Sequence, residues 1–513
     1  MSKKKYLEFL YLFLLGALSS LSLPPYNFFV INFLTFSLFF IFILKKKKFL
    51  VNKKTSFFYG WLFGFGYFFT NLYWISISLT FDVNFKFLIP ITIILIPAFL
   101  AIFYGLAIFF LFISNFKNIL SLFFLFALLL GSVEFLRGII LTGFPWNLIA
   151  FSFFNYIEIL QIISVIGTYA FNMLCISLFI SPAIFILKRS SGHFIIFISF
   201  LIIPIILYLN GSLKVKNFQN LDLIQNDYII RAISSNIKLE RFYGETETIP
   251  VLNELIELSN PSLNDKILFL WPEGIIPNIS QSELIKFKSL FDEKFNENHL
   301  LGLGINSQKT QNGKTKFFNS FSIYDNEFNL INSYDKVKLV PFGEFLPFEQ
   351  ILRTIGLKSL TNNYQSYSSG SNRDIIDINE NNLSFKILPL ICYEIIYSGK
   401  IFENNKFDYI INISEDGWFG NSIGPYQHYS HSIFRAIESG KYVIRSANNG
   451  ITAIVNPIGV AEQKILFGKN GYIDFREKRS VETTIFSKFG NKIFFVMILL
   501  YIFLIFSFNR NSK

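Results

Sequence analysis

Residues 385–399 read FKILPLICYEIIYSG and contain Cys392, one of only two cysteines in 513 residues. The aliphatic residues before Cys392 predict a buried strand, and the Tyr393-Glu394 pair directly after it indicates that the strand ends in a turn. A cysteine in this place is either a packed core residue or a nucleophile presented at a strand end. The stretch alone favours the core residue, because free cysteines are among the most buried side chains.

A second hydrophobic stretch, KILFLWPEGIIP (266–277), predicts a strand that stops at Trp-Pro with Glu273 at its tip. A carboxylate at a strand end is often just a solvated turn residue. A glutamate held against an apolar tryptophan instead has its pKa raised towards the range in which a general base works. Glu273 is therefore a candidate base, on the condition that a thiol lies beside it.

The stretch SYDKVKLVPFGEFLPF (333–348) places Lys336, Lys338 and Glu344 around a Pro-Phe-Gly-Glu turn. Lysines are usually solvated, but Lys336 and Glu344 flank a strongly apolar LVPF segment. A lysine in such surroundings can stabilise a thiolate or a developing oxyanion.

These stretches lie in a segment, residues 211–485, in which short β-branched or aromatic runs alternate with helical patterns. Such alternation predicts a layered α/β domain, and about 275 residues suffice for a complete core. We expect a surface loop at 361–382, where polar turn residues dominate. We expect strands at 228–235, 266–274, 299–306, 317–325, 383–391, 407–415 and 441–459, and helices at 248–258, 281–295 and 427–440.

The first part of the chain is apolar. Hydrophobic residues make up 52% of the whole sequence and charged residues 16%, and the mean hydropathy is +0.44, which is typical of a membrane protein. Glu134 and Arg137 are spaced to meet on one helix face inside an apolar segment, where charged residues are usually functional or paired. Segments close to the ~20 residues of a membrane-spanning helix predict about eight spans, at 6–23, 28–44, 57–80, 86–113, 119–143, 157–187, 194–209 and 493–508.

Lysine and arginine gather in alternate loops, which indicates the cytoplasmic side of a membrane. This pattern predicts that both termini are cytoplasmic, and an odd number of spans before residue 210 places the polar segment outside. The first apolar segment lacks a convincing cleavage site, so we interpret it as a helix and not as a signal peptide. The basic segments are 1–5, 45–54, 114–118, 188–193 and 509–513.

Composition excludes several classes of protein. The net charge is +11, but many basic residues stand beside apolar runs, so no nucleic-acid partner is expected. Cys175 lies in an apolar run and Cys392 in the polar half, so the two are not expected to pair. His428 and His431 are three residues apart but lack a third ligand, so we expect neither a metal nor a cofactor.

The order Glu273, Lys336, Cys392, each in a distinctive motif, resembles the nitrilase superfamily, and the apolar half resembles its membrane-embedded branch, the apolipoprotein N-acyltransferase family. The resemblance implies a polytopic helical membrane domain (residues 1–210, about seven spans), an extracytoplasmic nitrilase-like αββα sandwich (211–485) and a last helix with its tail (486–513). The motifs that carry it are YWI (73–75), E..R.....GFPW (134–146), WPE (271–273), YDKVKLVPFGEFLPF (334–348), ICYE (391–394), GWFGNSIGPYQH (417–428), RAIESG (435–440) and RSANNGITA (445–453).

The resemblance also implies roles for single residues. At the position of Lys338, the family does not require a lysine. The implied catalytic residues are Cys392 as nucleophile, Glu273 as general base and Lys336 as stabiliser of the thiolate or oxyanion, and the implied supporting residues are Glu344, Tyr393 and Glu394.

Two departures from the family pattern stand out. A tryptophan is usual where this chain reads SSNIKLERFYGE (234–245), and Phe242 or Tyr243 is a candidate replacement. The family's NISNDAWFG reads NISEDGWFG here, with Glu415 and Gly417 substituted. We interpret both departures as changes in the shape of the site, because the three implied catalytic residues, Glu273, Lys336 and Cys392, are all present.

By resemblance, we expect a monomeric enzyme of the bacterial inner membrane, with the catalytic domain on the periplasmic side. A phospholipid would donate an acyl chain to Cys392, and the α-amino group of a diacylglyceryl-modified apolipoprotein would accept it. Two alternatives stay open: a membrane-tethered nitrilase-type amidohydrolase, and a lipid-binding or transport protein with an inactive enzyme domain.

Overall fold

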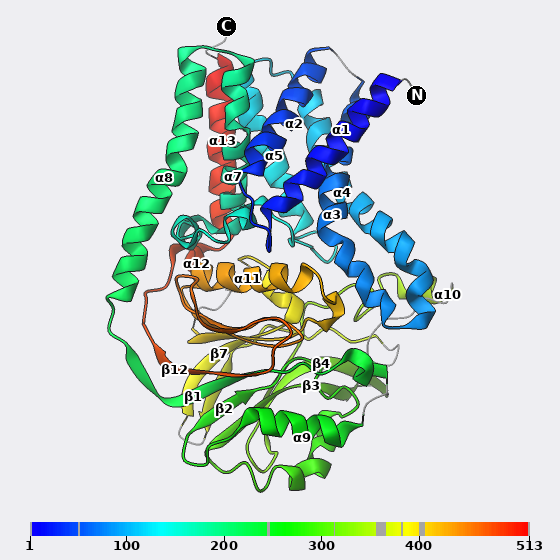
Figure 1. Ribbon diagram of the computed structural model, residues 1–513, viewed down its shortest axis with the longest axis vertical. Coiled ribbons are helices and arrows are strands. Elements are labelled where there is room, and N and C mark those ends of the chain that lie inside the picture. The colour runs from blue at the N-terminus through cyan, green and yellow to red at the C-terminus, as the bar shows by residue number, and fades with distance from the viewer. Residues whose placement is uncertain are drawn as a thin grey trace. The chain divides into compact units, whose positions relative to one another are not determined.

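The computed structural model of the protein describes residues 3–49, 52–243, 247–311, 313–354, 366–380, 383–399 and 406–510. The chain forms two compact units, one of helices and one that combines strands with helices (Figure 1). The helical unit comprises residues 1–219, 397–400 and 484–513, and the α/β unit comprises residues 220–396 and 401–483.

The long helices of the helical unit coincide with the apolar segments of the sequence. Among the described residues, five helices are long and apolar enough to cross a membrane: those ending at Ile113, Arg137, Leu187, Gln219 and Arg510. The number of about eight spans therefore stays a prediction. The helices are α1 Lys3–Ser19, α2 Ile31–Lys48, α3 Lys53–Leu72, α4 Ile89–Ile113, α5 Ile119–Arg137, α6 Ile157–Leu160, α7 Ile163–Leu187, α8 Ser191–Gln219, α12 Ile485–Phe489 and α13 Lys492–Arg510.

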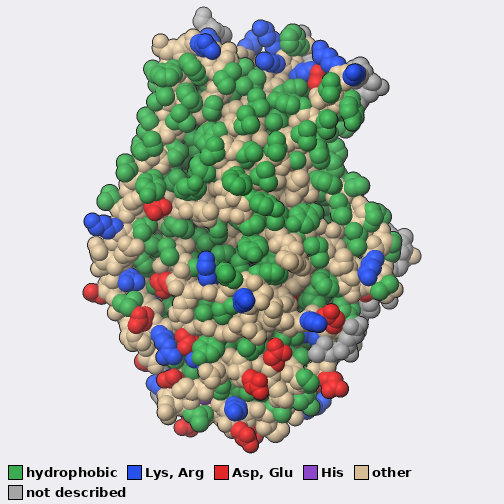
Figure 2. Space-filling view, in the orientation of Figure 1, with side chains coloured by type: hydrophobic (Ala, Val, Ile, Leu, Met, Phe, Trp, Pro, Cys, Tyr) green, Lys and Arg blue, Asp and Glu red, His purple; other side chains and the backbone are tan. Residues whose placement is uncertain are grey.

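Close packing holds this unit together. A Cβ on Gly16 would lie 1.9 Å from the carbonyl oxygen of Phe63, and a Cβ on Gly66 would lie 2.1 Å from that of Phe13. Glycine at both positions thus lets α1 and α3 approach to backbone contact, as small residues do in helix pairs within membranes. Figure 2 shows hydrophobic side chains covering this face of the unit, with Lys and Arg gathered at one of its ends.

The predicted Glu134 and Arg137 pair forms. The guanidinium of Arg137 donates to the carboxylate of Glu134 and also to the carbonyl oxygen of Phe144, and both charged side chains are fully buried. The pair therefore ties the end of α5 to the turn that follows it.

The α/β unit contains two six-stranded sheets, each with parallel strands at its centre. In the first sheet β1, β2 and β3 are parallel, and in the second sheet β7, β8 and β9 are parallel. The first sheet has the order β12-β1-β2-β3-β4-β5, with bounds Gly471–Lys478, Ile224–Ser234, Ile267–Leu270, His299–Gln311, Lys314–Tyr324 and Leu330–Asp335. The second has the order β11-β10-β9-β8-β7-β6, with bounds Ala461–Ile465, Thr452–Val455, Tyr442–Asn448, Tyr409–Glu415, Leu383–Ile391 and Ile376–Glu380.

The two sheets pack face to face, and a helix covers each outer face (Figure 1). Alternate residues of β1, β2 and β3 form one hydrophobic cluster with α9 (Thr248–Ser259), in which Leu252 and Trp271 are fully buried. On the other side, α11 (Gly424–Ser439) packs on β9 and β10. Between the sheets, the hydroxyl of Ser446 donates to the carbonyl oxygens of Ile233 and Leu270. The predicted αββα layering is confirmed.

Some local predictions were wrong. The stretch 281–295, expected as an α-helix, contains a 3-10 helix over Gln281–Leu290. The expected surface loop at 361–382 includes strand β6, while 361–365 and 381–382 lie outside the described residues. The sequence pattern also missed β5, β11 and β12, because edge strands bury little apolar surface and so lack a clear hydrophobic alternation.

Candidate functional site

The predicted trio meets at the carboxyl ends of strands. Glu273 follows β2, Lys336 follows β5 and Cys392 follows β7 directly. β5 runs in the same direction as β2, because β4 is antiparallel to both β3 and β5. The carboxyl ends of such strands lie at one edge, where α/β proteins commonly place their ligands.

Lys336 lies between two carboxylates. Its Nζ is 2.8 Å from Oε1 of Glu273 and 2.9 Å from Oε1 of Glu344. The side-chain amide of Asn319, on β4, donates to the same two oxygen atoms at 2.8 Å. The backbone N–H of Glu415 donates to Oε2 of Glu273 at 3.0 Å. Every oxygen of Glu273 is therefore held by a donor.

All three charged groups are buried, with exposed fractions of 6% for Glu273, 1% for Lys336 and 5% for Glu344. Burial lowers the pKa of Lys336, but Glu273 and Glu344 outweigh burial, and the pKa lies well above its ordinary value. Lys336 is therefore a fixed cation. Burial raises the pKa of Glu344, although the charge of Lys336 opposes this rise.

Cys392 begins the 3-10 helix η8 (Cys392–Ile396) with a φ of 49°. A side chain other than glycine in this left-handed region costs on the order of 1–3 kcal/mol, so the surrounding contacts must hold the turn. Burial raises the pKa of the thiol well above its ordinary value; Glu273 adds to this rise and Lys336 opposes it. The thiol is therefore protonated at neutral pH and needs a base before it can attack.

Glu394 joins the cysteine turn to the lysine turn. Its Oε2 accepts from the N–H of Ile391 at 2.9 Å, and its Oε1 accepts from the N–H groups of Val337 at 3.0 Å and Lys338 at 3.1 Å. Tyr334 donates its hydroxyl to both oxygens. The predicted supporting residue Glu394 is thus a structural clamp between the two turns. Tyr393, also predicted, is buried directly beside the nucleophile.

A second polar cluster contacts the backbone of Cys392. The ring Nδ1 of His428 is 2.8 Å from Oδ1 of Asp416, and Nη2 of Arg445 donates to Oδ2 of Asp416 at 2.7 Å. The ring Nε2 of His428 lies 3.2 Å from the carbonyl oxygen of Cys392. Burial raises the pKa of Asp416, but Arg445 and His428 lower it to about 2, so this side chain is a carboxylate.

Cys392, Asp416 and His428 are residue types that bind zinc, and one ligand atom from each lies within 4.8 Å of the others. Both carboxylate oxygens of Asp416 are engaged by His428, Arg445 and Ser414. The guanidinium of Arg445 balances the charge of the Asp416 carboxylate, so the charged groups of this cluster are already paired with one another. His431, which the sequence places three residues from His428, does not belong to this group.

The two departures from the family pattern meet in space. The carboxylate of Glu415 forms a buried ion pair with Arg241 and also accepts from Asn448. The ring of Phe242 lies 5.1 Å from that of Trp418 between ring centroids, and beside Gly274. The ring of Phe242 therefore lies close to the end of β2, beside the residue that follows Glu273.

Sequence reasoning missed several residues of this site. Asp416 and Arg445 lie in segments that resemble the family, and this resemblance is the signal in the sequence that could have pointed to them. Asn319 gave only a weak signal, an amide in the middle of an expected strand. The residues missed are Asn319, Tyr334, Ser414, Asp416, His428 as a neighbour of Cys392, and Arg445.

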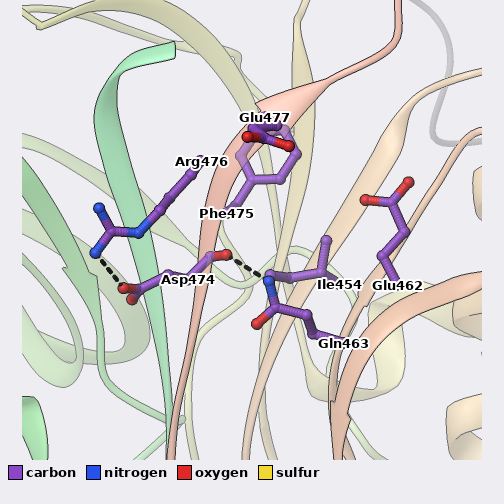
Figure 3. A pocket seen from close by; sticks show the side chains of 7 residues that line it. All are labelled: Ile454, Glu462, Gln463, Asp474, Phe475, Arg476 and Glu477. Atoms are coloured by element: carbon purple, nitrogen blue, oxygen red, sulfur yellow. Dashed lines mark hydrogen bonds and ion pairs between the residues drawn. The ribbon is translucent and has the colours of Figure 1, made fainter. Parts of the chain in front are cut away.

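A cavity of about 360 Å³ lies away from this cluster, where β11 and β12 approach each other (Figure 3). Gln463 donates to the carbonyl oxygen of Asp474 there, and Arg476 pairs with the carboxylate of Asp474. The lining residues are Ile454, Glu462, Gln463, Asp474, Phe475, Arg476 and Glu477. None of the predicted site residues lines it.

Comparison with known proteins gives matches to two family models. Residues 15–181 match the apolipoprotein N-acyltransferase N-terminal domain, and residues 268–465 match the carbon-nitrogen hydrolase domain. The second match contains Glu273, Lys336 and Cys392.

Relatives match over almost the whole chain. The apolipoprotein N-acyltransferase of Rickettsia prowazekii is 33% identical, and the match covers 96% of this chain and 96% of the relative. That of Rhodopseudomonas palustris is 31% identical, with 93% of this chain and 90% of the relative covered. Among solved structures, the nitrilase superfamily member Nit3 of Saccharomyces cerevisiae matches with a TM-score of 0.35 and 15% identity, covering 48% of this chain and 90% of Nit3.

Proposed function

The chain belongs to the apolipoprotein N-acyltransferase family, and from this premise we propose that it transfers an acyl chain from a membrane phospholipid to the N-terminal cysteine of an apolipoprotein. The acceptor is the α-amino group of a diacylglyceryl-modified cysteine, and the product is a triacylated lipoprotein. Cys392 carries the acyl chain between the two substrates.

In the first half-reaction, Sγ of Cys392 attacks the ester carbonyl carbon while Glu273 takes the thiol proton. The charge that develops on the carbonyl oxygen is stabilised by Lys336 and by backbone N–H groups at the cysteine turn. The bond between that carbon and the alcohol oxygen then breaks, and Glu273 returns the proton to the oxygen. A lysophospholipid leaves, and Cys392 holds the chain as a thioester.

In the second half-reaction, the α-amino nitrogen of the lipoprotein attacks the thioester carbonyl carbon. Glu273 takes a proton from the nitrogen, the C–S bond breaks, and Cys392 regains a proton. An amide forms and the enzyme returns to its starting state, which is a ping-pong sequence. Glu344 supports the site by sharing Lys336 with Glu273.

The observation that carries this proposal is the arrangement of Lys336 between Glu273 and Glu344 beside a buried, protonated thiol. A thiol with a raised pKa reacts only when a base removes its proton during the attack. The carboxylate of Glu273 is held by donors on both oxygens, so it is oriented before substrate arrives.

The membrane part supplies both lipid-anchored substrates in this proposal. Residues 1–210 and 486–513 form about eight spans, and residues 211–485 form the catalytic part on the periplasmic side of the bacterial inner membrane. Both termini are cytoplasmic, since the basic segments share one side. The protein works as a monomer.

The test uses the purified full chain in detergent with an equimolar mixture of dioleoyl-phosphatidylethanolamine and dioleoyl-phosphatidylglycerol. Mass spectrometry should find one oleoyl group on Cys392, which hydroxylamine removes. A diacylated lipopeptide added next should leave with that group as an amide. Cys392→Ala should abolish both steps, and Cys175→Ala, the matched control at the other free cysteine, should change neither.

Other outcomes distinguish the alternatives. Free oleic acid without an acylated lipopeptide would indicate an amidohydrolase-like enzyme that uses water as the acceptor. A wild-type chain that binds phospholipid but never forms the thioester would indicate a binding or transport protein. Either result would overturn the proposed function.

A further inference from the structure

The peptide group that follows the nucleophile is held by a histidine from a distant element. His428 lies on α11, 36 residues after Cys392, and its Nε2 is 3.2 Å from the carbonyl oxygen of Cys392. A carbonyl oxygen and a carboxylate oxygen only accept, so Nε2 carries the proton of this hydrogen bond and Nδ1 carries the proton shared with Asp416; the ring is an imidazolium when both bonds form. The bond is fully buried, because His428 has an exposed fraction of 0%.

The histidine is itself fixed by charged groups. Its Nδ1 lies 2.8 Å from Oδ1 of Asp416 and 3.2 Å from Nη2 of Arg445. Arg445 also donates to Asn412 and, through Nε, to the carbonyl oxygen of Ile451 at 3.1 Å. Asp416 follows β8 and Arg445 lies on β9, so neighbouring strands of the second sheet set the ring orientation.

This carbonyl matters because of the backbone at Cys392. The φ of 49° is unfavourable for cysteine, and relaxation of this angle would redirect both the thiol and the carbonyl oxygen. Glu394 holds one side of the turn through the N–H of Ile391. His428 holds the other side through the carbonyl of Cys392. Because the peptide is planar and trans, fixing this carbonyl also fixes the direction of the N–H of Tyr393, which points to the opposite side.

We propose that His428, oriented by Asp416 and Arg445, is a positioning residue that holds the Cys392 turn in its reactive conformation by donating from Nε2 to the Cys392 carbonyl. This inference rests on the proposed function, since its consequence is measured as the rate of acyl-thioester formation. His428 touches no reacting atom in this role, and it moves no proton.

Two substitutions separate positioning from other roles. In His428→Gln the side-chain amide nitrogen takes the place of Nε2 and keeps the donor to Cys392. In His428→Asn the shorter amide takes the place of Nδ1, keeps the contact with Asp416 and loses the donor to Cys392. Both variants therefore lose the imidazole, but only His428→Gln keeps the hydrogen bond to the carbonyl oxygen of Cys392.

A matched control is available in the same unit. His299 is also fully buried, with Nδ1 accepting from the N–H of Asn296 at 3.1 Å and Nε2 lying 3.0 Å from the carbonyl oxygen of Ser262. It contacts none of the site residues described above. His299→Gln and His299→Asn show how much the acylation rate changes when a buried histidine outside the site is lost.

The experiment measures single-turnover acylation of Cys392 in the full chain, in detergent with the two dioleoyl phospholipids, by mass spectrometry over pH 6 to 9. His428→Asn should slow acylation about 30-fold to 100-fold, as expected when a reacting group is slightly misplaced. His428→Gln should stay within about fivefold of the wild type near pH 7 and keep the acid limb of the pH profile, since a neutral amide donor suffices for this hydrogen bond. Both His299 variants should acylate at the wild-type rate, and the dependence on phospholipid concentration should not change in any variant.

Three results would overturn the inference. His428→Asn could acylate as fast as the wild type, or His428→Gln could be as slow as His428→Asn although both are folded by thermal melting. The pH profile of His428→Gln could lose its acid limb, which would identify the imidazole as the base that takes the thiol proton. If His428→Asn does not fold, the rate and pH profile of His428→Gln decide alone. Failure of the wild type to form a thioester would instead refute the proposed function, independently of the variants.

Discussion

Replacing Lys336 by methionine removes the cation that lies between Glu273 and Glu344. Two buried carboxylates then accept from the same amide of Asn319 with no positive charge between them. The simplest relief is to share one proton, as paired carboxylates do. At pH 7.5, placing a proton on a carboxyl group with an ordinary pKa of about 4.3 costs about 4 kcal/mol. This agrees with the roughly 3–5 kcal/mol lost when one partner of a buried ion pair is removed.

The shared proton gives the stability of Lys336→Met a pH dependence with a definite sign. In the folded variant, the shared proton raises the pKa of one carboxyl group above its value in the unfolded chain. The folded variant therefore binds more protons, and its stability rises as the pH falls. Each pH unit contributes about 1.4 kcal/mol, so the loss relative to wild type should shrink to about 1.5 kcal/mol at pH 5.5.

Thermal unfolding of the full chain in detergent, followed by tryptophan fluorescence, measures this effect. Lys336→Met should lower the midpoint on the order of 10 °C at pH 7.5 and clearly less at pH 5.5. The control is Lys338→Met, two residues away, where a half-buried lysine forms no ion pair in the described structure. It should change the midpoint by no more than about 2 °C, as surface substitutions do.

A double variant sharpens the test. Lys336→Met combined with Glu344→Gln removes one charge of each sign and leaves Glu273 held by donors, so it should recover most of the stability. Acylation of Cys392 should stay about 100-fold or more below wild type, because the oxyanion donor is missing. An equal loss of stability at both pH values, or a loss for Lys338→Met as large as for Lys336→Met, would refute this account of the buried charges.

Alkylation of Cys392 by iodoacetamide should rise with pH and reach its midpoint above that of a free cysteine, because burial raises the pKa of the thiol; a midpoint below pH 8 would contradict this. Glu394→Gln should lower stability by about 2–3 kcal/mol, since the amide group turns an acceptor towards backbone N–H donors into a donor, and an unchanged melting midpoint would disprove the clamp. Arg241→Met should destabilise the α/β unit more than Arg241→Met combined with Glu415→Gln, because the single change leaves a buried carboxylate unpaired; additive losses in melting experiments would contradict the pairing.

Much of the fold could be predicted because it depends on local patterns. Uninterrupted apolar segments predict the helices of the helical unit, and short β-branched runs predict β1, β2, β3, β4, β7, β8 and β9. The positions of Glu273 and Cys392 at strand ends could also be predicted from the sequence, since an apolar run stops one or two residues before each. Edge strands such as β6 and β11 were missed, because residues with one solvated face give no distinctive pattern.

The candidate site could be predicted only in part from the sequence. Cys392, Glu273 and Lys336 were identified through motifs, and the structure places the lysine against the glutamate. Asn319 and Arg445 were not identified, because their importance lies in what they contact. Asn319 becomes a site residue only when β4 pairs with both β3 and β5.

The order of residues along the chain indicates which segments are apolar enough for helices, which runs form central strands, and which side chains stand at the ends of those strands. These features follow from residue type and spacing along the chain. The folded structure was needed to show that Lys336 lies between two carboxylates, that Arg241 pairs with Glu415, and that His428 contacts the carbonyl oxygen of Cys392. The reason is physical: a charged or polar group can be buried only where partners satisfy it, and here the partners come from strands and helices far apart in the chain.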